Sequence, residues 1–231
     1  MTTDARQLKQ EICDVGLRLY QRGLVAGSDG NITTRLTEEQ VLCTPTMLCK
    51  GLMKPEDICV VDMEGNQLAG VRKRTSEVLL HLEIMKARPD VQSVIHCHAP
   101  HATAFAISGK PVPRAVMPET EFFFGEIPTA AYETPGTAAF ARTILPYVER
   151  TNVCLLANHG TVTYAESLEL AYNYTEILDA YCRILLLSQP LGPPVKLPAD
   201  KCRELEALRL SAGLAPPKVV AGGTDQEDRG K

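Results

Sequence analysis

The sequence lacks the segments that mark membrane and nucleic-acid-binding proteins. No apolar stretch approaches the roughly eighteen residues that a membrane span needs, and no basic-then-apolar leader follows Met1. No block of Lys or Arg is present, and a net charge of −4 with a pI of about 5.8 favours neither nucleic acid nor an anionic membrane. We therefore expect a cytoplasmic protein with neither of these partners.

Paired-cysteine motifs are absent too. The chain has eight cysteines, none of which forms a C-x-x-C pair, and most of them lie within apolar segments. Small buried thiols in a reducing compartment explain this pattern better than disulfides or a zinc finger do. We therefore expect free cysteines.

The apolar patterning predicts one α/β domain. With 231 residues, of which 45% are hydrophobic, the chain can bury one sizeable core. Segments with helical spacing alternate with short β-branched runs, which indicates a layered α/β sheet rather than an all-β fold. We predict helices at residues 4–21, 75–88, 100–107, 137–150 and 166–187, and strands at residues 41–43, 58–62, 91–98, 112–117 and 153–156.

Histidines end two of the predicted strands. In the run 91–98, His96 and His98 are two residues apart and therefore project from the same face of a strand. His159 follows another apolar run and precedes a glycine, whereas His81 lies within a predicted helix and is expected to be a packed residue. Three imidazoles with one open position are the ligand set of a catalytic zinc site, and we favour this interpretation over structural histidines.

Three polar segments have both a structural and a functional interpretation. Thr75, Ser76 and Glu77 suit a helix N-terminus as caps, but such a terminus also binds phosphate. The glycine-rich loop 27–31 is favoured as a plain helix-to-strand turn, although its Ser and Asn offer hydrogen bonds. In the segment 119–126, acids lie beside three phenylalanines, a setting that raises the pKa of a carboxyl group and suits it to proton transfer. Exposed acids at a hinge explain the segment equally well.

Five separated motifs resemble the class II aldolase/adducin family, of the fuculose-phosphate aldolase and ribulose-phosphate 4-epimerase type. In chain order they are Gly30-Asn31 after a Ser, Thr44-Pro45-Thr46, Thr75-Ser76-Glu77, His96-x-His98 and Asn158-His159-Gly160. The resemblance covers about residues 5–190. It implies one three-layer α-β-α domain with a central, mostly antiparallel or mixed sheet over residues 1–195. A C-terminal segment, 196–231, follows, and we expect disorder over about 214–231 because its apolar content is low.

The resemblance also implies a site. His96, His98 and His159 would hold Zn²⁺, with Mn²⁺ or Co²⁺ as alternatives, and Glu77 would be a fourth ligand or the base beside the metal. The phosphate of the substrate would be held by five residues, Ser28, Asn31, Thr46, Thr75 and Ser76. Glu121 would be a second acid, which a neighbouring subunit of a homotetramer supplies to a site at the subunit interface.

The implied activity is aldol cleavage of a ketose 1-phosphate, such as fuculose 1-phosphate, into dihydroxyacetone phosphate and an aldehyde. Cleavage next to a carbonyl leaves an enediolate, whose charge a Lewis-acidic metal stabilises. Glu77 would exchange the proton at the enediolate carbon, and Glu121 would serve the aldehyde oxygen. The alternatives are a pentulose-phosphate 4-epimerase, a sugar-phosphate dehydratase or decarboxylase, and, ranked below these, a non-enzymatic adducin-like module.

The chain departs from the family pattern at three points. No tyrosine follows Tyr181, although several members complete a neighbour's site with one, so Glu121 or another group would take that role. Met47 stands where the fuculose-phosphate enzyme has glycine after the Thr-Pro-Thr turn, which affects the fit around the phosphate. Lys50 could add positive charge there, but we expect a solvated surface lysine.

Overall fold

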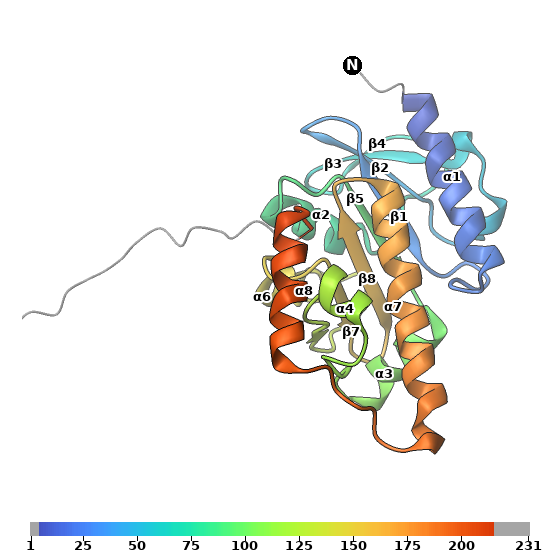
Figure 1. Ribbon diagram of the computed structural model, residues 1–231. Coiled ribbons are helices and arrows are strands. Elements are labelled where there is room, and N and C mark those ends of the chain that lie inside the picture. Colours follow the sequence, from blue (N-terminus) through green and yellow to red (C-terminus); the bar gives the residue numbers. More distant parts are fainter. Residues whose placement is uncertain (1–4, 215–231) are drawn as a thin grey trace, which may run out of the picture.

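One mixed sheet organises the computed structural model, which describes residues 5–214 (Figure 1). Its strands are β1 (Asn31–Arg35), β2 (Gln40–Cys43), β3 (Cys59–Asp62), β4 (Gln67–Ala69), β5 (Ser93–Cys97), β6 (Thr129–Ala130), β7 (Val153–Leu156) and β8 (Gly160–Ala165). Their order is β4-β3-β2-β1-β5-β8-β7-β6. Neighbours pair antiparallel except β6 and β7, which pair parallel. The predicted central sheet, mostly antiparallel or mixed, is confirmed.

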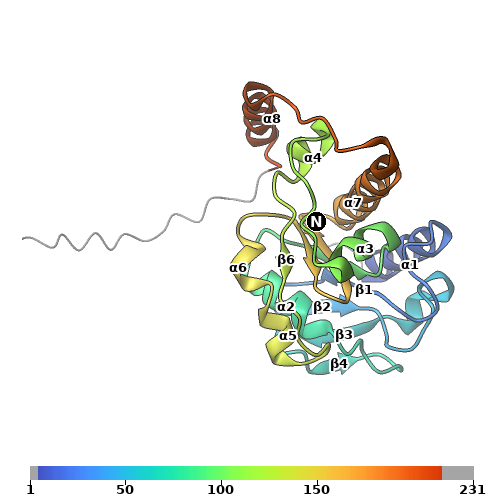
Figure 2. The same cartoon turned by 90° about the horizontal axis from the view of Figure 1, so that it is seen from below.

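Helices cover both faces of this sheet (Figure 2). The helices are α1 (Ala5–Gln21), α2 (Val78–Ala87), α3 (Pro100–Ser108), α4 (Pro118–Phe123), α5 (Ala138–Arg142), α6 (Leu145–Val148), α7 (Leu168–Ser188) and α8 (Ala199–Ser211), with short 3-10 turns at Lys50–Leu52, Pro55–Asp57 and Gln189–Leu191. One layer contains α1, α3 and α7, and the other contains α2, α5 and α6. The three-layer α-β-α fold is therefore confirmed.

The two faces of the sheet bury two separate cores. In β5, Val94 packs with the α2 side and its neighbour Ile95 packs with the α7 side. In β7, Cys154 and Leu155 divide between the cores in the same way. Because successive side chains point to opposite faces, a central strand covered on both sides must be apolar throughout. This explains why both residues directly before His96, and the run 153–157 before the turn with His159, are apolar.

The predicted strand at 112–117 is wrong. No strand forms there, because Pro111 and Pro113 have no backbone N–H to give to a ladder. The carbonyl of Pro113 instead accepts a hydrogen bond from Tyr181 Oη at 2.7 Å. Four strands, β1, β4, β6 and β8, were not predicted, and the predicted helix at 75–88 begins later, at Val78. The helix predicted at 137–150 forms as two short helices separated near Pro146.

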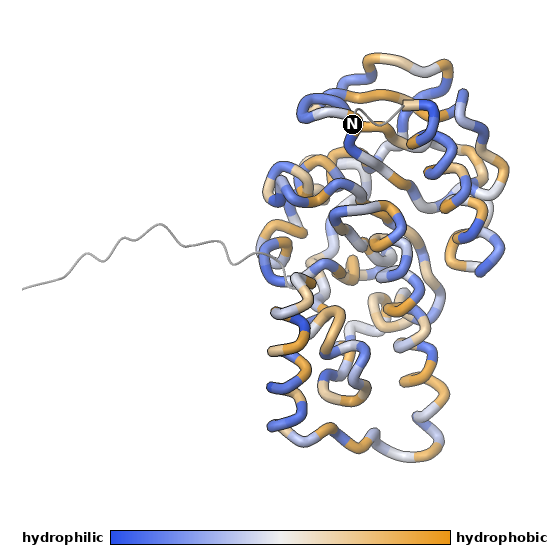
Figure 3. The backbone as a smooth tube through the Cα atoms, turned by 45° about the horizontal axis from the view of Figure 1, so that its top comes forward, coloured by the Kyte–Doolittle hydropathy of each residue, from blue (hydrophilic) through white to orange (hydrophobic). Residues whose placement is uncertain are grey.

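The C-terminal segment contains an unpredicted helix, α8, which packs against α4. Hydrophobic and hydrophilic residues mix along it (Figure 3). Of the stretch predicted to be disordered, Leu214 donates its N–H to the carbonyl of Arg209 at 3.1 Å. Residues 215–231 lie outside the described residues.

The structure of residues 5–214 also bears on the expected state of the cysteines and on membrane spans. All eight cysteines are free, as predicted. No helix in this part of the chain combines the length and apolar character needed to cross a bilayer.

His81 is packed in the interior, as predicted. Its ring is fully buried, and Nδ1 lies 2.9 Å from Thr33 Oγ1. Burial, together with a smaller effect of the nearby His96, lowers the pKa of His81 to about 3. The ring is therefore neutral in the folded protein at neutral pH.

This burial predicts acid sensitivity. The unfolded chain takes up the His81 proton below about pH 6.5 and the folded chain does not, so stability falls as the pH falls from about 6.5 towards 3. Between about pH 6.5 and pH 5, wild type should lose about 1.5 kcal/mol more than His81→Gln does. Urea unfolding of the chelator-treated proteins at both pH values measures this difference. Equal losses in the two proteins would contradict the buried, neutral ring.

Candidate metal centre

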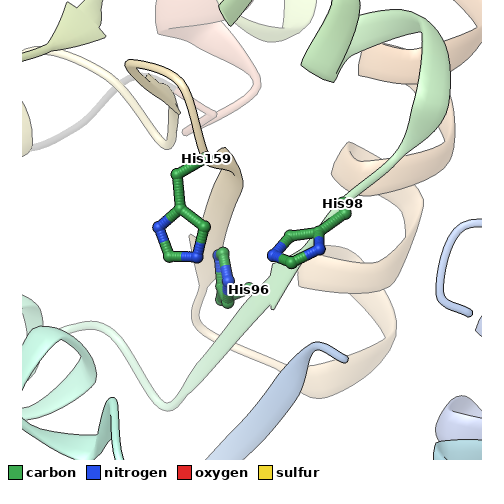
Figure 4. Close-up of side chains that lie close together, drawn as sticks. All are labelled: His96, His98 and His159. Atoms are coloured by element: carbon green, nitrogen blue, oxygen red, sulfur yellow. The ribbon is translucent and has the colours of Figure 1, made fainter. Parts of the chain in front are cut away.

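The three predicted histidines come from two neighbouring parts of the sheet and point toward one another (Figure 4). His96 lies at the end of β5, His98 follows that strand, and His159 lies in the turn between β7 and β8. Gly160 permits this arrangement, because a Cβ at that position would meet the carbonyl oxygen of Cys97 at 2.6 Å. The glycine after His159 therefore lets the turn lie directly against the end of β5.

The geometry of the rings suits one metal ion. The ring centroids are 5.2 Å apart for His96 and His98, 4.6 Å for His96 and His159, and 5.1 Å for His98 and His159. One nitrogen from each ring lies within 4.8 Å of the others. Ligands about 2.0–2.1 Å from a shared zinc ion are separated by distances of this order. The cluster can therefore hold a divalent metal and leave a coordination position open.

Hydrogen bonds set the orientation of two of the rings. His96 Nδ1 donates to the carbonyl oxygen of Thr161 at 2.9 Å, and His98 Nδ1 lies 3.2 Å from Asp29 Oδ2. The Nε2 atoms of both rings are buried and have no hydrogen-bond partner among the described residues. Outer contacts of this kind are typical of metal-binding histidines, because they fix the tautomer and direct the other nitrogen at the ion.

Burial also keeps two of the rings, those of His96 and His159, in the form that binds metals. Burial lowers the pKa of His96 well below its usual range, and His159 and His98 lower it further. Burial likewise lowers the pKa of His159, against the opposing effect of Glu77. Neutral imidazoles with free lone pairs are the ligands that a divalent metal requires.

Glu77 lies beside the cluster, where α2 begins. Its Oε2 is 3.4 Å from His96 Nε2, and its Oε1 is 3.3 Å from His159 Nε2. Asn31 Nδ2 donates to Oε2 at 2.8 Å, which fixes the plane of the carboxylate. A carboxylate in this position can complete a metal site or accept a proton next to it.

A cavity of about 210 Å³ adjoins His98, His159 and the Glu77 carboxylate. Its lining includes every residue predicted to bind phosphate, namely Ser28, Asn31, Thr46, Thr75 and Ser76. The walls come from the loop after α1, the turn after β2 and the start of α2. The structure thus brings together hydroxyl and amide groups that are far apart in the sequence.

Two residues of this cavity were missed or misjudged from the sequence. Lys50 was expected to be a solvated surface lysine, which is wrong, because it is 1% exposed and lines the cavity. Its Nζ donates to the carbonyl oxygens of Leu48 at 2.6 Å and Ser28 at 3.1 Å, and burial lowers its pKa to about 8. Asp29, the partner of His98, was not singled out, although it lies within the glycine-rich loop 27–31 that the family motifs mark.

Two non-glycine residues next to the site adopt left-handed backbone conformations. Met47, after Thr46, has a φ of 56°, and Asn158, before His159, has the same value. Such a conformation costs a non-glycine residue roughly 1–2 kcal/mol, although Asn tolerates it better than most. The turn at Met47 therefore keeps a glycine-like geometry without the glycine.

Glu121 lies elsewhere in the chain. It is buried on α4 and does not line the cavity. Arg114 Nη2 donates to its Oε2 at 2.9 Å, and the N–H of Ala115, a residue with a φ of 59°, donates to its Oε1 at 2.7 Å. The chain thus holds the carboxylate in a fixed orientation, and its role in a neighbour's site stays a prediction.

The chain is similar to known proteins over most of its length. The model of the family described as class II aldolase and adducin N-terminal domain matches residues 10–186. The 5-methylthioribulose-1-phosphate/5-deoxyribulose-1-phosphate aldolase of Rhodospirillum rubrum is 34% identical over 198 residues, which are 84% of this chain and 87% of that protein. A 3-oxo-tetronate 4-phosphate decarboxylase of Escherichia coli is 30% identical over 186 residues, 79% of this chain and 87% of that one. A solved L-fuculose 1-phosphate aldolase superposes with a TM-score of 0.82 at 29% identity, covering 90% of this chain and 97% of that one.

The contact between Asp29 and His98 generates a prediction. In Asp29→Asn, an amide nitrogen can face His98 Nδ1 in place of the accepting oxygen, so the ring loses the partner that orients Nε2. Metal affinity should fall by about 10- to 100-fold. Competition with a chelator of known affinity measures the change, and Asp14→Asn on the exposed face of α1 is the control. Wild-type affinity in Asp29→Asn would show that Asp29 does not support a metal ligand.

Proposed function

Because the chain belongs to the class II aldolase and adducin family, we propose that it is a zinc-dependent aldolase that cleaves a ketose 1-phosphate into dihydroxyacetone phosphate and an aldehyde. One observation carries the proposal: Glu77 and three imidazoles converge beside a cavity lined by all five predicted phosphate-binding residues. The names of the Rhodospirillum relative and of the solved fuculose 1-phosphate aldolase support a ketose 1-phosphate as substrate.

The metal belongs at His96, His98 and His159. A divalent ion held there supplies Lewis acidity that stabilises negative charge on the sugar fragment. Zinc is preferred because three imidazoles with an open position are its usual catalytic set, and Mn²⁺ or Co²⁺ are alternatives since nitrogen ligands do not exclude them.

Glu77 is the proton carrier. Its carboxylate is directed by Asn31 and stands at the N-terminus of α2, where the helix dipole favours negative charge. It can take a proton from, or return one to, the carbon next to the carbonyl of the substrate. Because the carboxylate is held before substrate arrives, it needs little rearrangement to do so.

The phosphate binds away from the reacting bond. Thr75 and Ser76 precede α2, whose N-terminal end attracts an anion, and Thr46, Ser28 and Asn31 complete the same cavity. Holding the phosphate there positions the reacting carbons next to Glu77. A phosphorylated sugar as substrate is also consistent with a cytoplasmic location of the enzyme, which is part of this proposal.

Glu121 is the second acid of this proposal. A neighbouring subunit of a homotetramer supplies it to the aldehyde oxygen, since its own chain places it away from the cavity. The same acid keeps the pentulose-phosphate 4-epimerase as an alternative, because that reaction breaks and remakes the same type of bond.

A decarboxylase is the second candidate, and the Escherichia coli relative favours it. Decarboxylation of a phosphorylated sugar acid also leaves charge next to a carbonyl, so it needs the same metal, cavity and carboxylate. A dehydratase shares this scaffold chemistry, whereas a non-enzymatic adducin-like module needs no metal.

The reaction can be identified with the purified, zinc-loaded chain. Incubation with a panel of ketose 1-phosphates, pentulose phosphates and phosphorylated 3-oxo acids should release dihydroxyacetone phosphate from at least one ketose 1-phosphate. Enzymatic assays for dihydroxyacetone phosphate, carbon dioxide and epimerised product separate the candidate reactions. Carbon dioxide release alone would replace the aldolase by the decarboxylase, and a chain that binds no metal would favour the module.

The role of Glu77 predicts a split between metal content and turnover. Glu77→Gln should keep about one metal ion per chain while losing about 10²- to 10⁴-fold in kcat. His98→Ala should lose both, and Glu83→Gln, farther along α2, should lose neither. Metal analysis and steady-state kinetics on the identified substrate measure both quantities. Full turnover by Glu77→Gln would remove Glu77 as the base.

A further inference from the structure

The cavity beside the metal centre contains two carboxylates and one buried ammonium group. Asp29 and Glu77 line it, and Lys50 is the one Lys or Arg residue of its lining within residues 5–214. A phosphate dianion that enters the cavity therefore meets two negative charges at short range. Positive charge is needed to offset them, and beyond a metal ion Lys50 is the one Lys or Arg of the described lining that can supply it.

The contacts of Lys50 are unusual for a lysine. It is 1% exposed, yet it forms no ion pair with any described carboxylate. Its Nζ donates to two backbone carbonyl oxygens, those of Leu48 and Ser28. An ammonium has three donors, so one proton remains for a ligand in the cavity. A buried cation with a spare donor suits a site that receives an anion.

The position of Lys50 also connects the two loops of the cavity. Ser28 belongs to the loop after α1, and Leu48 belongs to the turn that follows Thr46. One ammonium group bonded to both fixes their spacing. Ser28 and Thr46, which line the cavity, are thereby held at a fixed spacing around a ligand that contacts Nζ.

We propose that Lys50 is the residue by which this cavity selects a phosphate monoester over the unphosphorylated sugar. The proposal rests on the proposed function, since it concerns the phosphate half of that substrate. Lys50 binds the phosphate directly through its third N–H and contributes the charge that the flanking carboxylates oppose. A purely structural lysine would hold the loops without distinguishing phosphorylated from unphosphorylated ligands.

Binding measurements on the zinc-loaded full chain test this role. Calorimetric titrations use dihydroxyacetone phosphate, inorganic phosphate and dihydroxyacetone, which has the same carbonyl and hydroxyl groups but no phosphate. Lys50→Met removes the charge and the hydrogen bonds, and Lys50→Gln removes the charge while keeping an N–H donor. The matched control is Lys73→Met, because Lys73 is exposed and only its backbone carbonyl contacts Thr46.

In Lys50→Met, dihydroxyacetone phosphate and inorganic phosphate should bind roughly 10- to 100-fold more weakly, as expected for a lost charge-assisted hydrogen bond. Dihydroxyacetone affinity and metal content should stay at wild-type values, and Lys73→Met should bind all three ligands like wild type. Lys50→Gln should behave like Lys50→Met, which keeps the test valid if the methionine variant misfolds.

The other outcomes separate the two proposals. If wild type binds neither phosphorylated probe, the proposed function fails together with the role of Lys50. If wild type binds them and both Lys50 variants bind them equally well, the role of Lys50 is overturned while the proposed function stands. Equal weakening of all three ligands in the Lys50 variants would also overturn it, because Lys50 would then only support the loops.

Discussion

The register between β5 and β8 is the constraint on which the site depends. His96 lies opposite Val162 and Cys97 lies opposite Thr161, so the turn that contains His159 lies over the end of β5. The same register presents the carbonyl of Thr161, 65 residues away in sequence, to His96 Nδ1. A shift of one residue would turn His96 toward the opposite core and break this hydrogen bond. Pairing of two strands therefore determines both the ligand set and the tautomer of its most deeply buried member.

The remaining chemistry surrounds this pair of strands on one side of the sheet. His96 projects from β5 on the side covered by α2, and the start of α2 carries Glu77 there. The first residue of β1, Asn31, contacts Glu77 through its side chain. The metal centre, the proposed base and the cavity are thus contiguous although five separate segments supply them. The arrangement combines three imidazoles, two carboxylates and one ammonium group in a small volume.

The sequence predicted the features that depend on local periodicity or on recognisable motifs. His96 and His98 followed from the two-residue period of a strand, and the cavity-lining hydroxyls followed from the family motifs. The environment of Lys50 could not be predicted, because its burial depends on how the turn after β2 folds onto the loop after α1. The strand predicted at 112–117 does not form, because the prolines there lack the N–H that pairing requires, whatever the apolar pattern. Helix α8 was not predicted, because none of its residues is buried and its sequence shows no apolar face.

The left-handed backbone at Met47 and Asn158 links the stability of two turns to activity. The framework around both residues holds them in an unfavourable conformation. Met47 directly follows Thr46, and Asn158 directly precedes His159. When that framework softens, under warming or mild denaturant, relaxation of these turns relieves the strain. Activity would then be lost at a lower temperature or denaturant concentration than the one that unfolds the whole domain, because these turns change conformation first.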